Sequence, residues 1–272
     1  MTASTDGGGP RERPSGAVPI LELRGVSKRF GAVQALHEVD FDLREGEVTA
    51  LVGDNGAGKS VTIKCIAGIY PIDSGEILWE GKPVEIHGPK DAAALGIEIV
   101  YQDLALADNL DVVQNMYLGR EETTRFRALD ETKMERRCSE TLASLSVTTI
   151  RSVRQTVAGL SGGQRQSIAV AKAVMWNSRV VILDEPTAAL GVAQTRQVLD
   201  LVKRLAEQGL AVMLVSHNLH DIFEVADRIT VLRLGQAVAR FNTHETSQRE
   251  VVEAITAGTL STVPGQEAEV QP

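Results

Sequence analysis

The sequence predicts an α/β protein with a mixed sheet, an added antiparallel β layer and an inserted helical lobe. Apolar runs such as 48–52 and 180–183 alternate with longer helical patterns, which is typical of buried parallel strands joined by helices. Apolar and polar residues alternate at 20–23 and 39–43, which indicates strands with one solvent-facing side. The pattern becomes mostly helical from 103 to about 160, which predicts the lobe.

The elements are expected in a definite order. Strands are predicted at 20–23, 39–43, 48–52, 97–101, 180–183 and 210–215, with hairpins at 75–86 and 229–241. Helices are predicted at 59–67, 130–145, 161–175 and 192–208, with a short one after His217. One ordered domain over 18–257 follows, with its helical lobe at about 103–175. The segments 1–17 and 258–272 are rich in Gly, Pro, Ser, Thr and acids, so we expect a disordered N-terminal tail and a flexible C-terminal tail.

Composition limits the class of protein. The 272 residues suffice for one cored domain with a smaller lobe, and 43% hydrophobic with 24% charged residues is ordinary for a globular protein. No apolar run approaches the roughly 18 residues that span a bilayer, and the polar N-terminus lacks a secretory signal, so we expect a cytoplasmic protein. Cys65 and Cys138 fit a reducing compartment and lack metal-ligand spacing.

Charge argues against nucleic acid as a partner. The net charge of -8 is unsuited to a broad nucleic-acid surface. Basic residues between Arg120 and Arg137 are interspersed with acids, so a solvated face explains them better than a binding patch.

A glycine-rich segment at 53–60 predicts a phosphate-binding loop. Its letters, GDNGAGKS, fit G-x-x-x-x-G-K-[ST] and lie between an apolar strand and a helix. The predicted nucleotide contacts are Gly53, Asp54, Asn55, Gly56, Ala57, Gly58, Lys59, Ser60 and Val61. Lys59 is expected at the β- and γ-phosphates and Ser60 at Mg²⁺, while Val61 offers only its backbone. A ligand-free βα turn is the alternative, and the Lys-Ser pair disfavours it.

A pair of acids follows a buried strand at 180–185, which reads VVILDE. The carboxyl ends of such strands carry ligands in open α/β sheets. Asp184 is therefore the predicted Mg²⁺ ligand, through water, and Glu185 the group that polarises the attacking water. An acidic cap on a loop would explain the pair equally well without the phosphate loop.

The segment LSGGQ begins a helix with Ser161 as its predicted N-cap. The glycines at 162 and 163 would let a phosphate approach the helix N-terminus. A capped glycine loop explains the letters but not their position, with Gln164 only 20 residues before Asp184.

Together these motifs resemble the ABC (ATP-binding cassette) ATPase family. GDNGAGKS, Gln102, LSGGQ, VVILDE and His217 occur in the family's order, and the resemblance covers about 20–241. It implies that Gln102 contacts Mg²⁺ or the attacking water, that His217 contacts the γ-phosphate, and that Phe30 stacks on adenine. Each residue also has a purely structural interpretation. Gln102 could be an ordinary polar residue at a strand end, His217 a structural histidine, and Phe30 a half-buried core aromatic.

The resemblance also implies ATP and Mg²⁺ as cofactors and a dimer of two copies. Ser161, Gly162, Gly163 and Gln164 of one copy would complete the phosphate loop of the other. Gly191 stands where the family usually has an aspartate, so a contact from that side chain is not expected here.

Further likeness is to bacterial monosaccharide importers of the ribose, xylose and fructose type. It lies in Asp54 and Asn55, in the stretch 96–121 and in PTAALGV. It implies an ATPase on the cytoplasmic face of the membrane, with a separate permease and an extracytoplasmic sugar-binding protein as partners. The permease would dock on about 104–118, whose apolar residues could equally form lobe core. The alternative function is a soluble ABC ATPase that regulates a protein or nucleic acid.

Overall fold

The computed structural model describes residues 18–257, and both predicted tails lie outside the described residues. Its larger sheet has six strands in the order β10-β9-β3-β8-β7-β6. These are β3 (Val48–Val52), β6 (Ile97–Val100), β7 (Val180–Asp184), β8 (Ala211–Val215), β9 (Arg228–Arg233) and β10 (Gln236–Asn242). All neighbours pair in parallel except β10, which pairs antiparallel with β9. The predicted mixed sheet is confirmed.

A second, antiparallel sheet has the order β2-β1-β4-β5. It consists of β1 (Leu21–Phe30), β2 (Val33–Leu43), β4 (Ser74–Trp79) and β5 (Lys82–Val84). The predicted β layer is confirmed, but the first hairpin extends well beyond 20–23 and 39–43. Register shifts in β1 after Leu23, Val26 and Lys28 break the alternation of apolar and polar residues, which hid the rest of the strand.

The described residues form eight α-helices. They are α1 (Lys59–Ile66), α2 (Pro89–Ala94), α3 (Val112–Tyr117), α4 (Glu131–Ser144), α5 (Gly162–Val174), α6 (Val192–Glu207), α7 (Leu219–Val225) and α8 (Gln248–Ala257). Helices α2 and α8 were not predicted from the sequence. Helix α8 buries Val251 and Ala254 in the core.

The expectation that 103–160 is mostly helical is wrong outside α3, α4 and a short 3₁₀ turn at 157–159. The intervening loops satisfy their backbone groups in other ways. The buried Asn115 side chain accepts a hydrogen bond from Ala107 N–H and donates to the carbonyls of Ala107, Leu110 and Asp111. A side chain can thus replace helical hydrogen bonds in a packed loop.

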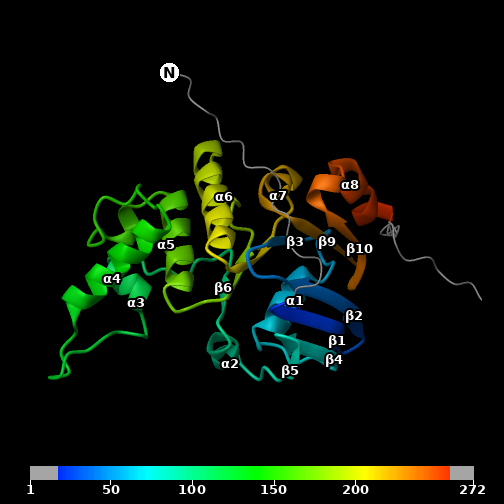
Figure 1. Ribbon diagram of the computed structural model, residues 1–272, viewed down its shortest axis with the longest axis horizontal. Coiled ribbons are helices and arrows are strands. Elements are labelled where there is room, and N and C mark those ends of the chain that lie inside the picture. The colour runs from blue at the N-terminus through cyan, green and yellow to red at the C-terminus, as the bar shows by residue number, and fades with distance from the viewer. Residues whose placement is uncertain (1–17, 258–272) are drawn as a thin grey trace, which may run out of the picture.

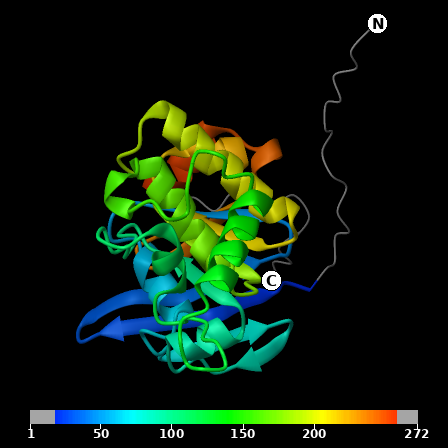
Figure 2. The same cartoon turned by 90° about the vertical axis from the view of Figure 1, so that its left-hand side faces the viewer.

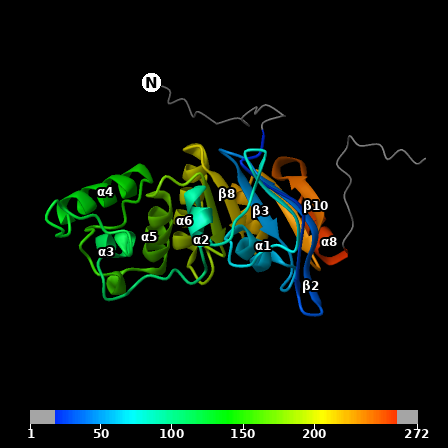
Figure 3. The same cartoon turned by 90° about the horizontal axis from the view of Figure 1, so that it is seen from below.

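The two faces of the larger sheet are buried against different layers. Ala50 and Val52 of β3 pack in a cluster that extends to the lobe, whereas Leu51 faces α1 and the antiparallel sheet. Helices α3, α4 and α5 form one end of the molecule, with the antiparallel sheet lying apart from them (Figures 1 and 3). Figure 2 shows that sheet beneath the helical layer. Within residues 18–257 no helix has the length and apolar character needed to cross a membrane.

Candidate nucleotide-binding site

Four neighbouring strands bring the predicted motifs to one edge of the larger sheet. Strands β3, β8, β7 and β6 lie side by side in parallel, so their carboxyl ends share that edge. The phosphate loop follows β3, His217 follows β8, the acid pair ends β7, and Gln102 follows β6. This is the edge at which open α/β sheets bind ligands.

The phosphate loop folds around the Lys59 ammonium. Lys59 Nζ donates to the carbonyl oxygens of Gly53, at 2.6 Å, and Asp54, at 3.0 Å. Burial lowers the pKa of Lys59, and the nearby carboxylates of Glu185, Asp54 and Asp184 oppose that shift. The ammonium is therefore partly desolvated and close to the acid pair, which favours an anionic ligand between them.

The end of the loop fits only a glycine. Gly58 is the N-cap of α1 and has φ of 109°, a conformation that L side chains rarely adopt. A Cβ there would lie 2.8 Å from Leu36 Cδ2 and 3.0 Å from the Ala35 carbonyl oxygen. The loop is thus packed tightly against β2 of the antiparallel layer.

The remaining residues of the phosphate loop differ in their exposure to solvent. Asp54, Asn55, Gly56 and Ser60 are exposed, so their polar groups can reach a ligand. Val61 is half-buried and packs against the core, which leaves its side chain a structural role.

The acid pair adopts an unexpected backbone geometry. Glu185 has φ of 51°, the left-handed region that costs a non-glycine residue about 1–3 kcal/mol. Its N–H donates to the Val215 carbonyl of β8 at 2.8 Å, which holds the residue in place. Sequence patterns carry no signal for this conformation, which sets the direction of the side chain.

Glu185 contacts the predicted switch histidine directly. His217 Nδ1 lies 2.9 Å from Glu185 Oε2, with the glutamate side chain 16% exposed and the histidine 76% exposed. Burial, followed by repulsion from Glu185, raises the pKa of the Asp184 carboxyl, while Lys59 lowers it. A cation beside Asp184 would relieve this unfavourable ionisation.

The LSGGQ segment begins α5 with the predicted cap. Ser161 accepts a hydrogen bond from Gln164 N–H at 3.4 Å, and Gln164 Oε1 accepts from Ser161 N–H at 2.9 Å. This reciprocal pair is a capping box. A Cβ on Gly163 would lie 3.0 Å from Gln194 Cβ, so tight packing within the chain also favours this glycine.

The structure thus unites some predicted residues and separates others. Lys59, Asp184, Glu185 and His217 form one group linked by contact or charge. Phe30 lies at the tip of the β1–β2 hairpin and is 41% exposed. The LSGGQ helix α5 belongs to the lobe, apart from α1 in Figures 1 and 3.

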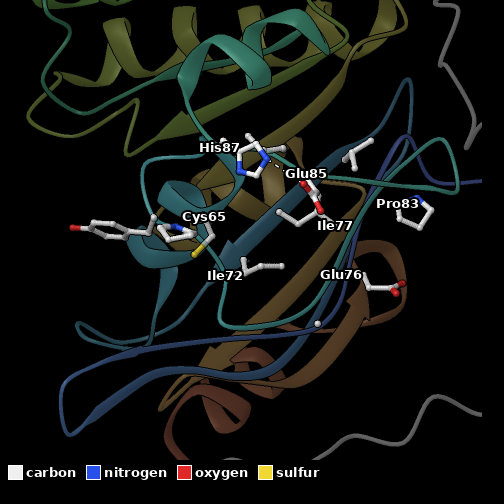
Figure 4. Close-up of a pocket in the computed structure, with 12 residues that line it drawn as sticks. Cys65, Ile72, Glu76, Ile77, Pro83, Glu85 and His87 are labelled. Carbon is white, nitrogen blue, oxygen red and sulfur yellow. Dashed lines mark hydrogen bonds and ion pairs between the residues drawn. The ribbon is translucent and has the colours of Figure 1, made fainter.

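A surface cavity of about 460 Å³ lies elsewhere, beside the end of α1 and the β4–β5 hairpin. Figure 4 shows Cys65, Ile72 and Ile77 lining it, with His87 and Glu85 in contact nearby. None of the predicted site residues lines it.

The fold and the site define a P-loop nucleotide-binding protein, in which a glycine loop and a strand-end acid pair share one sheet edge. The family model described as ABC transporter matches residues 36–188, and the chain belongs to this family.

Several similar proteins have names that refer to sugar import. The chain is 47% identical to the fructose import ATP-binding protein FrcA of Rhizobium meliloti, over 88% of this chain and 94% of that protein. It is 44% identical to the xylose/arabinose import ATP-binding protein XylG of Sulfolobus acidocaldarius, over 90% and 96%. It is 46% identical to the ribose import ATP-binding protein RbsA 1 of Rubrobacter xylanophilus, over 82% of this chain and 44% of that protein.

The likeness to a solved structure bears on the fold and not on the function. A nucleotide-free ATP-binding cassette from an ABC transporter superposes with a TM-score of 0.76 at 24% identity, covering 86% of this chain and 98% of that one.

Proposed function

We propose that this protein is the ATP-hydrolysing subunit of an ABC importer that takes up a monosaccharide through a separate permease. The observation that carries the proposal is the row of strand ends presenting the Lys59 loop, His217, the acid pair and Gln102 at one sheet edge. The relatives named for fructose, xylose/arabinose and ribose import support the substrate class.

ATP is gripped at its phosphates by the loop at 53–60 and the start of α1. Lys59 exchanges its contacts to Gly53 and Asp54 for the β- and γ-phosphates, since its ammonium already points into the loop. Exposed Ser60 and half-buried Asp184 supply oxygen donors, the chemistry that Mg²⁺ prefers, with Gln102 as a further donor. The raised pKa of Asp184 also fits a cation there. Bound Mg²⁺ would neutralise charge on the phosphates.

Hydrolysis depends on Glu185 as the group that orients and polarises water. The left-handed backbone at Glu185 and its hydrogen bond to Val215 preorganise the carboxylate. His217, in contact with Glu185, is positioned to reach the γ-phosphate while staying close to that carboxylate.

Two copies complete one another. Ser161, Gly162, Gly163 and Gln164 of one copy close over the phosphate loop of the second, which excludes water and strengthens the charge interactions there. Gly191, the N-cap of α6, has no side chain to cross the dimer interface, so that interface relies on other groups.

The remaining partners are a membrane permease and an extracytoplasmic sugar-binding protein, with the ATPase on the cytoplasmic face. The predicted docking stretch at 104–118 is only partly available. Val112, Val113, Met116 and Tyr117 are buried in the lobe, as the alternative interpretation held, while Leu118 is 47% exposed. We therefore assign docking to the half-buried and exposed residues at 104–111 and to Gln114 and Leu118.

Two substitutions test the ATPase. Glu185→Gln should lower turnover at least about 100-fold while ATP binding persists, because it removes the base but keeps the shape of the side chain. Glu140→Gln, on the exposed face of α4, is the matched control and should keep the parent rate. Lys59→Ala should weaken ATP binding at least about tenfold. Parent turnover in Glu185→Gln would refute its role, and parent affinity in Lys59→Ala would refute the loop.

Light scattering tests the dimer. Glu185→Gln with ATP and Mg²⁺ should elute as a dimer, because bound ATP persists between the copies. Adding Ser161→Arg, which places a bulky cation at the closing surface, should return it to a monomer. A monomer in Glu185→Gln at saturating ATP would contradict the shared site.

Affinity purification from native membranes tests the transport assignment. A permease should be recovered with this chain, and deletion of the gene should abolish uptake of one labelled monosaccharide among fructose, xylose, arabinose and ribose. Recovery of ribosomes or DNA without a permease would favour the alternative, a soluble regulatory ATPase.

A further inference from the structure

Phe30 contacts Tyr70, from the loop 67–73 between α1 and β4, and Lys28, from its own strand β1. Its ring centroid lies 4.9 Å from that of Tyr70, with the planes at 72°, an edge-to-face pair. The ammonium of Lys28 lies 5.5 Å from the Phe30 centroid. Phe30 nevertheless keeps 41% exposure, so part of the ring remains free to contact a ligand.

The same loop fixes the end of the strand that carries Phe30. Asp73 Oδ1 accepts from Lys28 Nζ and Asp73 Oδ2 accepts from Arg29 N–H, both at 2.7 Å. Asp73 N–H donates to the Ser27 carbonyl at 2.9 Å. The Lys28 side chain is 9% exposed and the Asp73 side chain 46% exposed, so only the lysine end of this clamp is shielded from water.

The loop is also tied to the helix that begins at the phosphate loop. Tyr70 N–H donates to the Lys64 carbonyl at 3.1 Å, which caps the end of α1, and Lys64 Nζ lies 5.4 Å from the Tyr70 centroid. Helix α1 starts at Lys59, so one rigid element connects the phosphate loop to the Tyr70–Phe30 pair. The cavity of Figure 4 lies against Tyr70 as well, so packing on that side is incomplete.

We propose that Tyr70 is a positioning residue for the nucleotide base: by packing against Phe30 it holds that ring in the orientation in which an adenine stacks on it. The proposal rests on the proposed ATP-binding function and on the stacking of adenine on Phe30 that the resemblance to the ABC ATPase family implies. A ring fixed before binding loses less rotamer freedom when the base arrives, and stacking on it is correspondingly more favourable.

The sharpest test compares ATP with inorganic tripolyphosphate, which has the phosphates but no base. Tyr70→Leu should raise the Kd for ATP about 3- to 10-fold, the range for ordering one side chain. Its Kd for tripolyphosphate should match the parent within about twofold, because the phosphate loop is untouched. Tyr70→Phe keeps the ring and should bind ATP as the parent does. In hydrolysis, Tyr70→Leu should raise KM with little change in kcat.

The outcomes separate this inference from the ATPase proposal. Equal losses for ATP and tripolyphosphate in Tyr70→Leu, or parent ATP affinity, would overturn the positioning role. In a Phe30→Leu background, Tyr70→Leu should have no further effect, and a full additional loss would also overturn it. Lys59→Ala should weaken both ligands; if it weakens neither, the ATPase proposal itself fails. If Tyr70→Leu does not fold, Asp73→Asn weakens the bonds that join the loop of Tyr70 to the end of the strand carrying Phe30, and it should give the same ATP-selective loss.

Discussion

Replacing Gly58 by alanine should destabilise the protein more than the same change at Gly56. Both glycines have positive φ, 109° and 81°, so each alanine carries backbone strain of about 1–2 kcal/mol. Only at Gly58 does the new Cβ also meet other atoms, at 2.8 Å and 3.0 Å, whereas nothing lies within 4 Å at Gly56. Overpacking of this kind costs about 1–3 kcal/mol. We therefore expect losses of about 2–5 kcal/mol for Gly58→Ala and about 1–2 kcal/mol for Gly56→Ala.

Urea unfolding followed by far-ultraviolet circular dichroism measures both losses, with equal m-values required for a direct comparison. The restriction of the unfolded chain by alanine is the same in both variants and cancels in their difference. Equal destabilisation of the two variants would refute the close approach of the loop to Ala35 and Leu36. A larger loss at Gly56 would contradict the packing of the loop altogether.

Three further changes test other parts of the structure. Asp184→Asn should stabilise the nucleotide-free protein at neutral pH. The folded pKa of Asp184 is raised, so its carboxyl lowers the stability of the parent as pH rises from about 3.8 through that folded pKa. The melting temperature of the variant should therefore gain on that of the parent between pH 4 and pH 8, and a constant difference would contradict the raised pKa. The Cys138 thiol is fully buried and burial raises its pKa to about 12, so it should react with a disulfide reagent at pH 8 only as fast as the chain unfolds; rapid reaction in the folded state would contradict its burial. Asn115→Ala should cost about 2–3 kcal/mol in urea unfolding, because it leaves Ala107 N–H unpaired, and a loss below 0.5 kcal/mol, roughly that of a surface change, would be inconsistent with that bond.

Much of the fold could be predicted because its central strands are apolar on both faces. The runs at 48–52, 180–183 and 210–215 correspond to β3, β7 and β8, whose residues are almost all fully buried. Parallel strands direct their carboxyl ends to one edge, so the motifs after them could be expected to meet without coordinates. Helix caps at Ser161 and Asp130 likewise depend on local chemistry that the sequence displays.

Other features depend on contacts that no local pattern records. The β1–β2 hairpin extends through irregular register, so its alternation is broken where it approaches Phe30. The left-handed backbone of Glu185 is stabilised by a hydrogen bond to β8, a neighbour distant in sequence. Tyr70 lies in a loop of unremarkable composition, and its importance arises only because the chain brings it against Phe30.

The LSGGQ segment shows how one motif can satisfy two demands that sequence cannot separate. The close approach of α6 to α5 favours a glycine at 163, since Gln194 Cβ lies 3.0 Å from where a Cβ would stand. A Cβ on Gly162 would meet the ends of two side chains, Leu190 at 2.9 Å and Gln194 Oε1 at 3.8 Å, and both Ser161 and Gly162 are exposed. The case for ligand contact therefore depends on Ser161 and Gly162 more than on Gly163. A Gly163→Ala variant would also change the packing of α5 against α6, so the ligand-binding role of the segment must be tested at its exposed residues.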